Sequence, residues 1–402
     1  MQKIKLGIIG FGNIGCGTHA KNIWKGKCPE VELTAVADFN PERLEACRTM
    51  CKEYQAEYPD HNIAEPLLFE SAEAMMDAKV VDAVLVAVPH YDHPDLTIKA
   101  LDRGLHVMCE KPAGVYTLQV REMMAAADRH PELVFGMMFN QRTNPVFRKM
   151  REIIQSGELG QVRRTNWLIT NWYRPQYYYD SGAWRATWSG EGGGVLLNQC
   201  PHNLDLWQWI CGMPTKIHAH MHFGKWHDIE VEDDVTAYAE YANGATGTFI
   251  TSTGDTPGTN RFEVVCDGGT LICEDAKKLT LKKLEMTIDE YSKTNKTAAF
   301  GKPKAEVIEL TPEGENSQHV GVLNAFAAAI LRGEPLVADG REGINGLMIS
   351  NAMHLSAWEG RTVELPFDEK AFYDHLMEHV KTSRRKENVN SVVSDTSGSF
   401  NA

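Results

Sequence analysis

Long hydrophobic runs are missing from this chain of 402 residues, and no stretch stays apolar over the about 20 residues that a membrane-spanning helix needs. Met1 leads directly into a strand-like segment, without the pattern of a signal peptide. Basic residues are also in deficit, because 41 lysines and arginines face 54 acidic residues and give a net charge of −13. We therefore expect a cytoplasmic protein that has neither nucleic acid nor membranes as partners.

Cysteine and histidine spacing gives no sign of a disulfide framework or a metal centre. The nine cysteines are an odd number without paired spacing, which favours reduced thiols. Neither His90 with His93 nor Cys200 with His202 follows a recognisable zinc spacing. We therefore expect no metal site.

A glycine-rich segment near the N-terminus has the strongest functional pattern in the chain. An apolar run ends in three glycines, Gly10, Gly12 and Gly15, at the G-x-G-x-x-G spacing of a dinucleotide-binding βαβ unit. A purely structural turn would explain this spacing equally well. A second apolar run, however, ends at Asp38, where an acidic residue would hold the ribose hydroxyls of NAD and repel the phosphate of NADP. We therefore predict NAD, although the nearby cation Arg43 favours NADP.

The chain is longer than a single hydrophobic core usually supports, so two domains are expected. Residues 1–140 alternate strand-like runs with helical patterns, which predicts a Rossmann-type doubly wound parallel sheet with helices on both faces. Residues 141–387 contain successive strand-like runs separated by turn residues, which predicts an α/β domain with a large, mainly antiparallel open sheet. Residues 388–402 are rich in Ser, Asn and Gly, and we expect a mobile tail there.

Polar residues follow the fourth and fifth strand-like runs, at the edge where ligands bind beside a parallel sheet. Pro89, His90 and His93 follow the fourth run, and Glu110 and Lys111 follow the fifth. A lysine at this edge can be desolvated, which would let it polarise a substrate hydroxyl or share in proton transfer. The alternative is an ordinary solvated lysine before a proline.

The segment Gly192 to Asp205, with the sequence GGGVLLNQCPHNLD, is the second candidate region. Its three glycines allow a ligand to approach the backbone closely. Asn198 and His202 are four residues apart, so they would share one face of a helix, and histidine is the natural general base at neutral pH. Pro201 argues against a regular helix there because it removes a backbone donor. A structural histidine is the alternative.

Eight Trp and Tyr residues gather in one short segment: Trp167, Trp172, Tyr173, Tyr177, Tyr178, Tyr179, Trp184 and Trp188. Aromatic rings stack on the C–H faces of sugars and on flat aglycones, while tyrosine hydroxyls and Arg174 or Arg185 bond to ring hydroxyls. The alternative is that these residues fill the domain core or an oligomer contact. We expect about half of them to line a substrate site.

Taken together, these motifs resemble those of the glucose-fructose oxidoreductase and inositol dehydrogenase family (Gfo/Idh/MocA), over nearly the whole chain. The motifs, in order, are GIIGFGNIG, VPHYDH, CEKP, NQRTNP and GGGVLLNQCPHNLD. The resemblance implies a Rossmann domain followed by an α/β domain whose open sheet commonly forms a homo-oligomer. It also implies that Lys111 is the essential lysine and His202 the essential histidine.

The predicted site residues follow from the motifs and the resemblance together. Those predicted to contact NAD are Gly10, Gly12, Asn13, Ile14, Asp38, Pro89, His90, His93, Glu110, Lys111 and Asn140. Those predicted to contact substrate are Lys111, Arg142, Trp172, Tyr173, Arg174, Trp184, Arg185, Asn198 and His202. Lys111, His202 and Asn198 form the predicted catalytic group.

One residue departs from the family pattern. Many members carry an aspartate four residues before the histidine, where this chain has Asn198. An asparagine cannot supply the negative charge that raises the basicity of a histidine, so His202 would act with a lower pKa or with help from Lys111. If Asn198 only orients His202, Asn198→Asp should move the acidic limb of the pH-rate profile to higher pH.

The sequence therefore predicts an NAD-dependent oxidoreductase that oxidises a secondary hydroxyl of a sugar or glycoside. Within the family, NQCPHNLD beside the aromatic segment is most similar to enzymes that convert the 3-hydroxyl of a glucoside to the 3-keto form, including those that prepare C-glycosides for cleavage. The alternatives are an inositol or polyol dehydrogenase, an NAD-dependent redox-type glycosidase and a non-catalytic NAD and sugar sensor. The presence of both Lys111 and His202 counts against a sensor.

Overall fold

The structure, a computed structural model, describes residues 2–384, which divide into two compact units. The first unit holds residues 2–143 together with Ser317–Leu347, and the second holds Asn144–Asn316 together with residues 348–384. The sequence predicts that all of 141–387 belongs to the second domain, whereas the structure places Ser317–Leu347 in the first unit. The predicted tail, 388–402, lies outside the described residues.

The first unit contains a six-stranded sheet in the order β3-β2-β1-β4-β5-β6. Its strands are β1 (Ile4–Ile9), β2 (Val31–Ala37), β3 (Leu67–Phe69), β4 (Ala83–Val86), β5 (His106–Cys109) and β6 (Phe135–Met137). All neighbouring strands are parallel, and the strand order reverses beside β1. This arrangement confirms the predicted Rossmann sheet, whose ligand site lies at the carboxyl ends of the strands next to that reversal.

Helices connect these strands, and some of them start where the sequence supplies a cap. The helices are α1 (Lys21–Trp24), α2 (Pro41–Glu57), α3 (Ala72–Asp77), α4 (His93–Leu101), α5 (Thr117–Arg129) and α10 (Gln318–Arg332). The side chain of Asn40 caps α2 by accepting the Glu42 N–H at 2.9 Å. The helix expected after the glycine turn begins instead with a π-helical segment, Gly15–Ala20, which continues into α1.

The helix α10 explains why Ser317–Leu347 belongs to the first unit. Its buried face contributes Val322, Leu323, Phe326 and Ala327 to the hydrophobic core that also contains the side chains of β1 and β2. The apolar pattern of 320–331 predicts a helix, but it does not identify the sheet against which the helix packs. Burial of that face against the Rossmann core decides the assignment.

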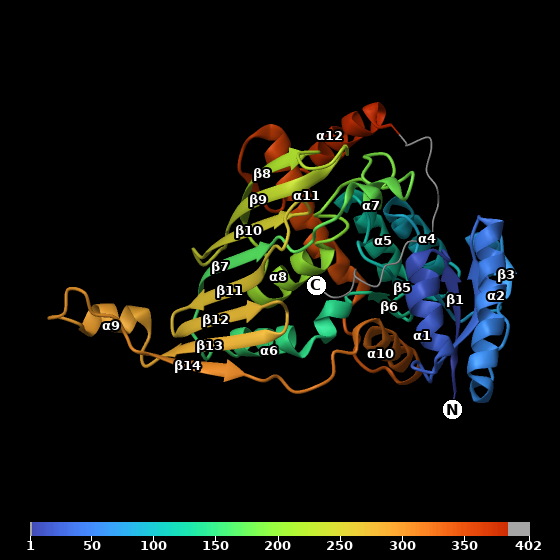
Figure 1. Cartoon of the computed structure of the whole chain (residues 1–402), viewed down its shortest axis with the longest axis horizontal. Helices are drawn as coiled ribbons and strands as arrows, with labels where there is room; N and C mark the ends of the chain where they lie inside the picture. The colour runs from blue at the N-terminus through green and yellow to red at the C-terminus, as the bar shows by residue number, and fades with distance from the viewer. Residues whose placement is uncertain (1, 385–402) are drawn as a thin grey trace. The chain divides into compact units, whose positions relative to one another are not determined.

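The second unit is organised around a nine-stranded sheet in the order β14-β13-β12-β11-β7-β10-β9-β8-β15 (Figure 1). Its strands are β7 (Val162–Ile169), β8 (Lys216–Phe223), β9 (Glu232–Glu240), β10 (Thr246–Ser252), β11 (Asn260–Cys266), β12 (Gly269–Glu274), β13 (Lys278–Leu284), β14 (Ala305–Leu310) and β15 (Val363–Glu364). Only β7 and β10 pair in parallel, so the sheet is mainly antiparallel, as predicted.

Helices cover one face of this sheet. The helices of the second unit are α6 (Pro145–Ser156), α7 (Gln176–Asp180), α8 (Pro201–Cys211), α9 (Ile288–Thr294), α11 (Gly343–Glu359, which begins in the first unit) and α12 (Glu369–Thr382). Trp167 of β7 stacks on Phe262 of β11 with 4.1 Å between ring centroids, and Phe147 of α6 packs against Trp167. Trp207 of α8 covers Phe249 of β10 and donates its indole N–H to Thr165 at 2.9 Å. These large rings form the core of the unit.

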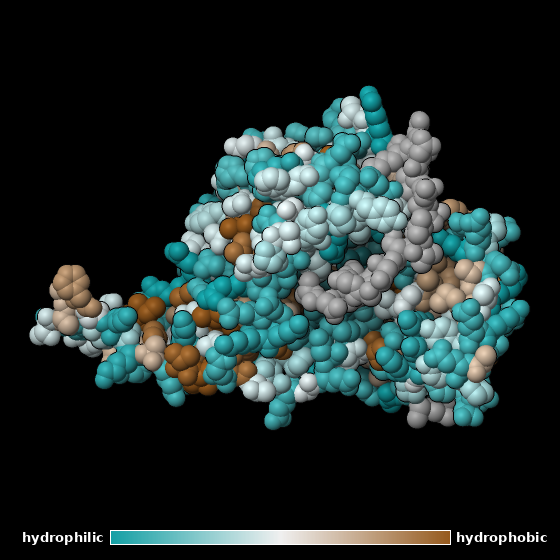
Figure 2. All heavy atoms as spheres, viewed as in Figure 1, coloured by the Kyte–Doolittle hydropathy of each residue, from teal (hydrophilic) through white to brown (hydrophobic). Residues whose placement is uncertain are grey.

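The residues that alternate with this core point to the opposite face of the sheet. This open face is defined by Leu168, Tyr238, Ile250, Val265 and the histidines His218 and His220, each of them partly or fully exposed. Figure 2 shows hydrophobic atoms over the strands of the second unit, among hydrophilic neighbours. The open sheet expected from the sequence is therefore present.

All nine cysteines lie within the described residues and are free thiols. Among residues 2–384, no helix combines the length and the hydropathy of a membrane span. The same residues contain no group of three or more His, Cys, Asp or Glu side chains placed to hold a metal ion.

Candidate functional site

The three glycines of the turn after β1 differ in the space that surrounds their Cα atoms. Gly10 has φ +93°, and a Cβ there would overlap the carbonyl oxygen of Ala87, while a Cβ on Gly15 would overlap the carbonyl oxygen of Gly10. At Gly12 the nearest atom to an added Cβ is Arg43 Nη1 at 3.9 Å. The first and third glycines are thus required by packing, and the second faces open space that suits a pyrophosphate.

Asp38 lies at the end of β2 and joins that strand to the glycine turn. Its Oδ2 accepts the Phe11 N–H at 2.8 Å, and its Oδ1 accepts the Asn40 N–H at 2.9 Å. Arg43 Nη1 lies 3.4 Å from Asp38 Oδ2, with its own side chain 45% exposed. The two backbone N–H groups therefore fix the orientation of the Asp38 carboxylate. The same carboxylate pairs with Arg43, the cation that favours NADP.

Glu110, which follows β5, forms a buried pair that sequence patterns did not reveal. Its Oε1 lies 2.7 Å from His19 Nε2, and the ring of His319 packs edge-on against His19 at 5.5 Å. Burial opposes ionisation of Glu110, but the hydrogen bond and the positive charges of its neighbours outweigh burial and lower its pKa to about 2. Burial lowers the pKa of His319 to about 4. These histidines come from distant segments without a shared motif.

His93 ties together the two loops that follow β4 and β5. Its Nδ1 lies 2.6 Å from the carbonyl oxygen of Pro112, and its Nε2 lies 2.8 Å from that of Val88. Burial lowers the pKa of the His93 ring, although both carbonyls favour its protonation. Pro89 and His90 lie on the same loop, with His90 buried.

The remaining predicted residues of the first unit differ in exposure. Lys111 is partly exposed, and its backbone N–H lies 3.2 Å from Glu110 Oε2. Asn140 is buried after β6 and donates its amide to Gln318. The Arg142 side chain is 1% exposed and pairs with Glu342 at 2.8 Å, inside the first unit. Arg142 was predicted to contact substrate, and here it forms a buried ion pair. Asn13 and Ile14 are half-buried on the glycine turn.

These residues share one edge of the parallel sheet. They follow β1, β2, β4, β5 and β6, which are consecutive neighbours in the sheet order. The carboxyl ends of parallel strands lie at the same edge, so the structure brings the predicted cofactor residues together.

In the second unit, the glycine-rich segment is fixed by the buried carboxylate of Glu232. Glu232 accepts the Gly194 N–H at 2.8 Å and the Leu196 N–H at 2.9 Å, and a Cβ on Gly194 would overlap the carbonyl oxygen of Glu232. His354 Nε2 lies 3.0 Å from this carboxylate, which raises the pKa of the ring although burial opposes protonation. The sequence predicts that these glycines let a ligand approach the backbone closely. At Gly194, the backbone of Glu232 is the group that lies close.

The helix α8 begins at Pro201, so this proline occupies the first helical position, where its missing N–H costs nothing. His202 is the second residue of the helix and is partly exposed. Asn198 lies before the helix, and the two residues therefore do not share a regular helical face, contrary to the prediction. The Asn198 amide nitrogen donates to Glu191 and, at 3.3 Å, to the Tyr178 hydroxyl.

The eight aromatic residues divide between the core and the surface. Trp167, Tyr179 and Trp188 are at most 5% exposed and belong to the core. Tyr173 and Tyr177 are exposed, and Trp172, Tyr178 and Trp184 are partly exposed. Five of the eight are thus at least partly exposed, and the share of them that lines a substrate site stays a prediction.

Tyr178 is the centre of a polar and aromatic cluster in this unit. Its hydroxyl oxygen receives Arg185 Nη1 at 2.9 Å, and the amides of Asn198 and Gln199 at 3.3 Å each. The Arg185 guanidinium lies over the Tyr178 ring at 4.6 Å and over the Trp184 ring at 4.7 Å. Arg174 lies over Tyr178 on the same segment, at 5.3 Å, and over Trp172 at 5.5 Å. The structure thus gathers five predicted substrate residues around one ring.

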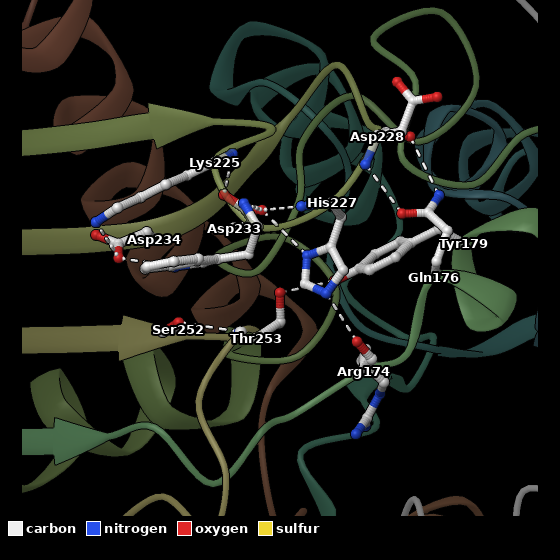
Figure 3. Close-up of polar contacts among 12 residues, drawn as sticks. Arg174, Gln176, Tyr179, Lys225, His227, Asp228, Asp233, Asp234, Ser252 and Thr253 are labelled. Atoms are coloured by element: carbon white, nitrogen blue, oxygen red, sulfur yellow. Dashed lines mark hydrogen bonds and ion pairs between the residues drawn. The ribbon is translucent and has the colours of Figure 1, made fainter.

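A second buried carboxylate, that of Asp233, contacts the loop that packs against the aromatic segment (Figure 3). Asp233, at the start of β9, accepts the backbone N–H groups of Lys225, Trp226 and His227. The His227 ring lies between Asp233 Oδ2, at 3.0 Å from Nδ1, and the Arg174 carbonyl oxygen, at 2.8 Å from Nε2. The Tyr179 hydroxyl donates to Thr253 at 2.8 Å. These contacts fix the backbone of the segment while its outer rings stay exposed.

Both units match known protein families. Residues 4–137 match a family described as an oxidoreductase family with an NAD-binding Rossmann fold, and residues 147–272 match the GFO/IDH/MocA C-terminal domain. The two matches together cover more than half of the chain.

Individual relatives agree with these matches. The D-glucoside 3-dehydrogenase of Escherichia coli (strain K12) is 28% identical over 258 residues, which are 60% of this chain and 68% of that relative. The inositol 2-dehydrogenase of Rhizobium meliloti (strain 1021) is 24% identical over 368 residues, 90% of this chain and 99% of that relative. The WlbA dehydrogenase of Chromobacterium violaceum, solved with NADH and UDP-GlcNAcA, is 25% identical with a TM-score of 0.73, over 92% of this chain and 97% of that chain. The chain therefore belongs to the Gfo/Idh/MocA family of NAD-dependent oxidoreductases.

Proposed function

We propose that this protein oxidises a secondary hydroxyl of a sugar or glycoside, and specifically the 3-hydroxyl of a glucoside to the 3-keto form. The observation that carries the proposal is the cluster around Tyr178, in which aromatic rings, two guanidinium groups and two amides are grouped in the unit that also contains His202. Rings that stack on a sugar face, next to donors for its hydroxyls, suit a pyranoside. The similarity to a D-glucoside 3-dehydrogenase supports the choice of hydroxyl.

The glycine turn and Asp38 fit NAD. Gly12 leaves room for a pyrophosphate next to the backbone, and the carboxylate of Asp38 is oriented by one N–H donor of the glycine turn, Phe11, and one of its own loop, Asn40. When it is bound, NAD supplies the acceptor for the hydrogen that leaves the substrate carbon with its electron pair.

The chain itself supplies the proton chemistry. In the proposed mechanism, neutral His202 takes the hydroxyl proton as the carbon–oxygen double bond forms, and the Lys111 ammonium stabilises the negative charge that develops on that oxygen. Lys111 follows Glu110, whose Oε1 lies 2.7 Å from His19 Nε2. The proposed role of Lys111 rests on its position after β5, at the carboxyl edge of the parallel sheet.

The alternative activities differ in their substrates and in the products that they release. An inositol or polyol dehydrogenase, which the match to inositol 2-dehydrogenase favours, would act on substrates without an aglycone. A redox-type glycosidase would release aglycone with no net NADH. A panel of glucosides, C-glycosides and cyclic polyols, followed by NADH absorbance and mass spectrometry, separates the three activities. Reduced cofactor together with a 3-keto glucoside is the expected result.

Asp38 should set the choice of cofactor. Asp38→Ala should narrow the preference for NAD over NADP, because the variant loses an acceptor for the ribose hydroxyls and no longer repels a phosphate. Titration of both cofactors measures this, and Arg43→Ala is the matched control that should keep the preference for NAD. Wild type binding NADP as tightly as NAD would refute the assignment.

Lys111→Ala should lower turnover at least about a hundredfold while NAD binding persists, since one electrostatic group at the reacting oxygen is lost. Lys111→Arg should not restore turnover, because arginine does not give up a proton and has a different shape. Lys99, which pairs with Glu73 and Asp95 on the surface, is the control, and Lys99→Ala should retain full turnover. Near-normal turnover in Lys111→Ala would make Lys111 an ordinary surface lysine.

The exposed aromatic rings should affect the binding of substrate and leave the binding of NAD unchanged. Trp172→Ala or Tyr173→Ala should raise the Michaelis constant for glycosides and leave NAD affinity unchanged. The core residue Trp188 serves as the comparison, because Trp188→Ala should lower the unfolding temperature. Unchanged kinetics with lowered stability in the first two variants would place their rings in the core.

The open face of the nine-stranded sheet is our proposed contact with a second copy of this chain. Ile250 lies on β10, next to the central strand β7, so Ile250→Glu should reduce the molecular mass measured by light scattering from that of an oligomer towards that of one chain. The exposed Tyr177, outside the sheet, provides the control Tyr177→Glu. A wild-type protein with the mass of a single chain would contradict this proposal.

A further inference from the structure

A basic arm extends from one end of the nine-stranded sheet and belongs to neither candidate site. The arm is residues 277–304, which run through β13 and α9 to the start of the edge strand β14. In Figure 1, α9 lies beyond the ends of β13 and β14. We propose that this arm binds the acidic surface of a second copy of this chain, with Phe300 near its tip as the apolar anchor. The inference goes beyond the proposed function, because it involves no turnover.

The arm has a charge opposite to that of the rest of the chain. It contains eight lysines, no arginine and three acidic residues, which gives a net charge of +5. The whole chain carries −13, so the residues outside the arm carry −18. A positive segment is attracted to the negative surface of another copy. The eight lysines, all exposed, are Lys277, Lys278, Lys282, Lys283, Lys293, Lys296, Lys302 and Lys304.

The chain's own carboxylates neutralise little of this charge. Among residues 2–384, only one of the eight arm lysines forms an ion pair, Lys278, which lies 3.2 Å from Glu309. Asp289, an acidic residue of the arm, pairs at 3.0 Å with Arg163, which lies outside the arm. The ammonium groups of the other seven lysines therefore have no carboxylate of the described chain within ion-pair distance.

The tip of the arm has a defined conformation although it has no hydrophobic core. No residue of 288–304 is buried. The Asn295 side chain accepts the Ala298 N–H at 3.0 Å and donates to the Ala298 carbonyl at 2.8 Å. A Cβ on Gly301 would overlap the Tyr291 hydroxyl, so the loop after α9 folds back against that helix. Local hydrogen bonds and close packing thus order the tip before it meets a partner.

Phe300 lies on this ordered tip with its ring in solvent. It is 102% exposed, compared with 81% for Phe39, the next most exposed large hydrophobic residue of the described chain. Figure 2 shows hydrophobic atoms at the end of the arm. Burial of a phenylalanine ring removes a large apolar area from water, and an ordered tip loses little further entropy on binding. These are the properties of an aromatic anchor at a protein interface.

The base of the arm continues the open face of the sheet. The strand register pairs Val265 with Thr270, Thr270 with Lys282, and Lys282 with Val307. Paired positions lie on the same face of a sheet, so Lys282 and Val307, which is 62% exposed, lie on the side of the open face. A second copy on that face would meet the base of the arm. In a two-fold pair each copy would give one arm and receive one, which covers both anchors.

Photo-cross-linking identifies what the tip contacts. In the full-length protein, Phe300 is replaced by the photoreactive p-benzoylphenylalanine, and Phe39, exposed in the first unit, is replaced in a matched control. Irradiation should join two chains from position 300 in at least about fivefold higher yield than from position 39, because an anchor is held against its partner. Mass spectrometry should find the cross-linked peptide outside the arm. Products of a single chain only, or equal yields from the two positions, would overturn the inference.

Charge reversal tests the electrostatic part. The variant K293E/K296E/K302E reverses three lysines near the tip, and K27E/K52E/K79E makes the same change in net charge at exposed lysines of the first unit. Sedimentation velocity on a dilution series measures self-association. The tip variant should raise the dissociation constant at least about tenfold more than the control. Added salt should weaken association of wild type more than that of the tip variant. Equal dissociation constants for the two triple variants would contradict the proposal.

A basic arm could also bind another polyanion, and two probes distinguish these occupants. Wild type and the tip variant are mixed with a DNA duplex and with vesicles that contain phosphatidylserine. Binding of either probe that is lost in the tip variant, without a cross-link between chains, would overturn the inference. Failure of wild type on every glycoside and polyol would refute the proposed function alone, because none of these measurements depends on turnover.

Discussion

Buried carboxylates that accept backbone N–H groups hold each functional segment of this protein in place. Asp38 binds the glycine turn through Phe11, Glu232 binds the glycine-rich segment through Gly194, and Asp233 binds the loop before β9. A carboxylate removed from water is costly unless its oxygens receive hydrogen bonds. These hydrogen bonds therefore stabilise the observed conformation of each loop.

A buried carboxylate also lies next to a predicted site residue in each of the two units. In the first unit, Glu110 pairs with His19 and precedes Lys111 at the carboxyl edge of the parallel sheet. In the second unit, the buried carboxylate of Glu191 accepts the Asn198 amide. In both places, a hydrogen bond to the buried acid stabilises the backbone or the side chain of the site residue.

Membership of the Gfo/Idh/MocA family agrees with this arrangement of segments. The NAD-binding edge belongs to the parallel sheet and the aromatic cluster belongs to the unit with the open sheet. The Tyr178 cluster is the part of the second unit that we propose to contact the substrate.

Local patterns in the sequence were enough for the Rossmann sheet, the antiparallel sheet and the glycine turn with Asp38. Each of these depends on neighbours within a few residues, on alternation or on a short motif. Pro201 counted against a regular helix in the sequence, and the structure shows that it begins the helix α8.

Only the tertiary structure decided the contacts between distant segments. The packing of α10 on the first unit, the pairing of Glu110 with His19, the ion pair of Arg142 and the partner of Asn198 all join residues that no periodicity connects. Side-chain type limits which hydrogen bonds a residue can make, but the choice among possible partners depends on which groups the folded chain removes from water together. That choice is a property of burial, and burial is set by the whole fold.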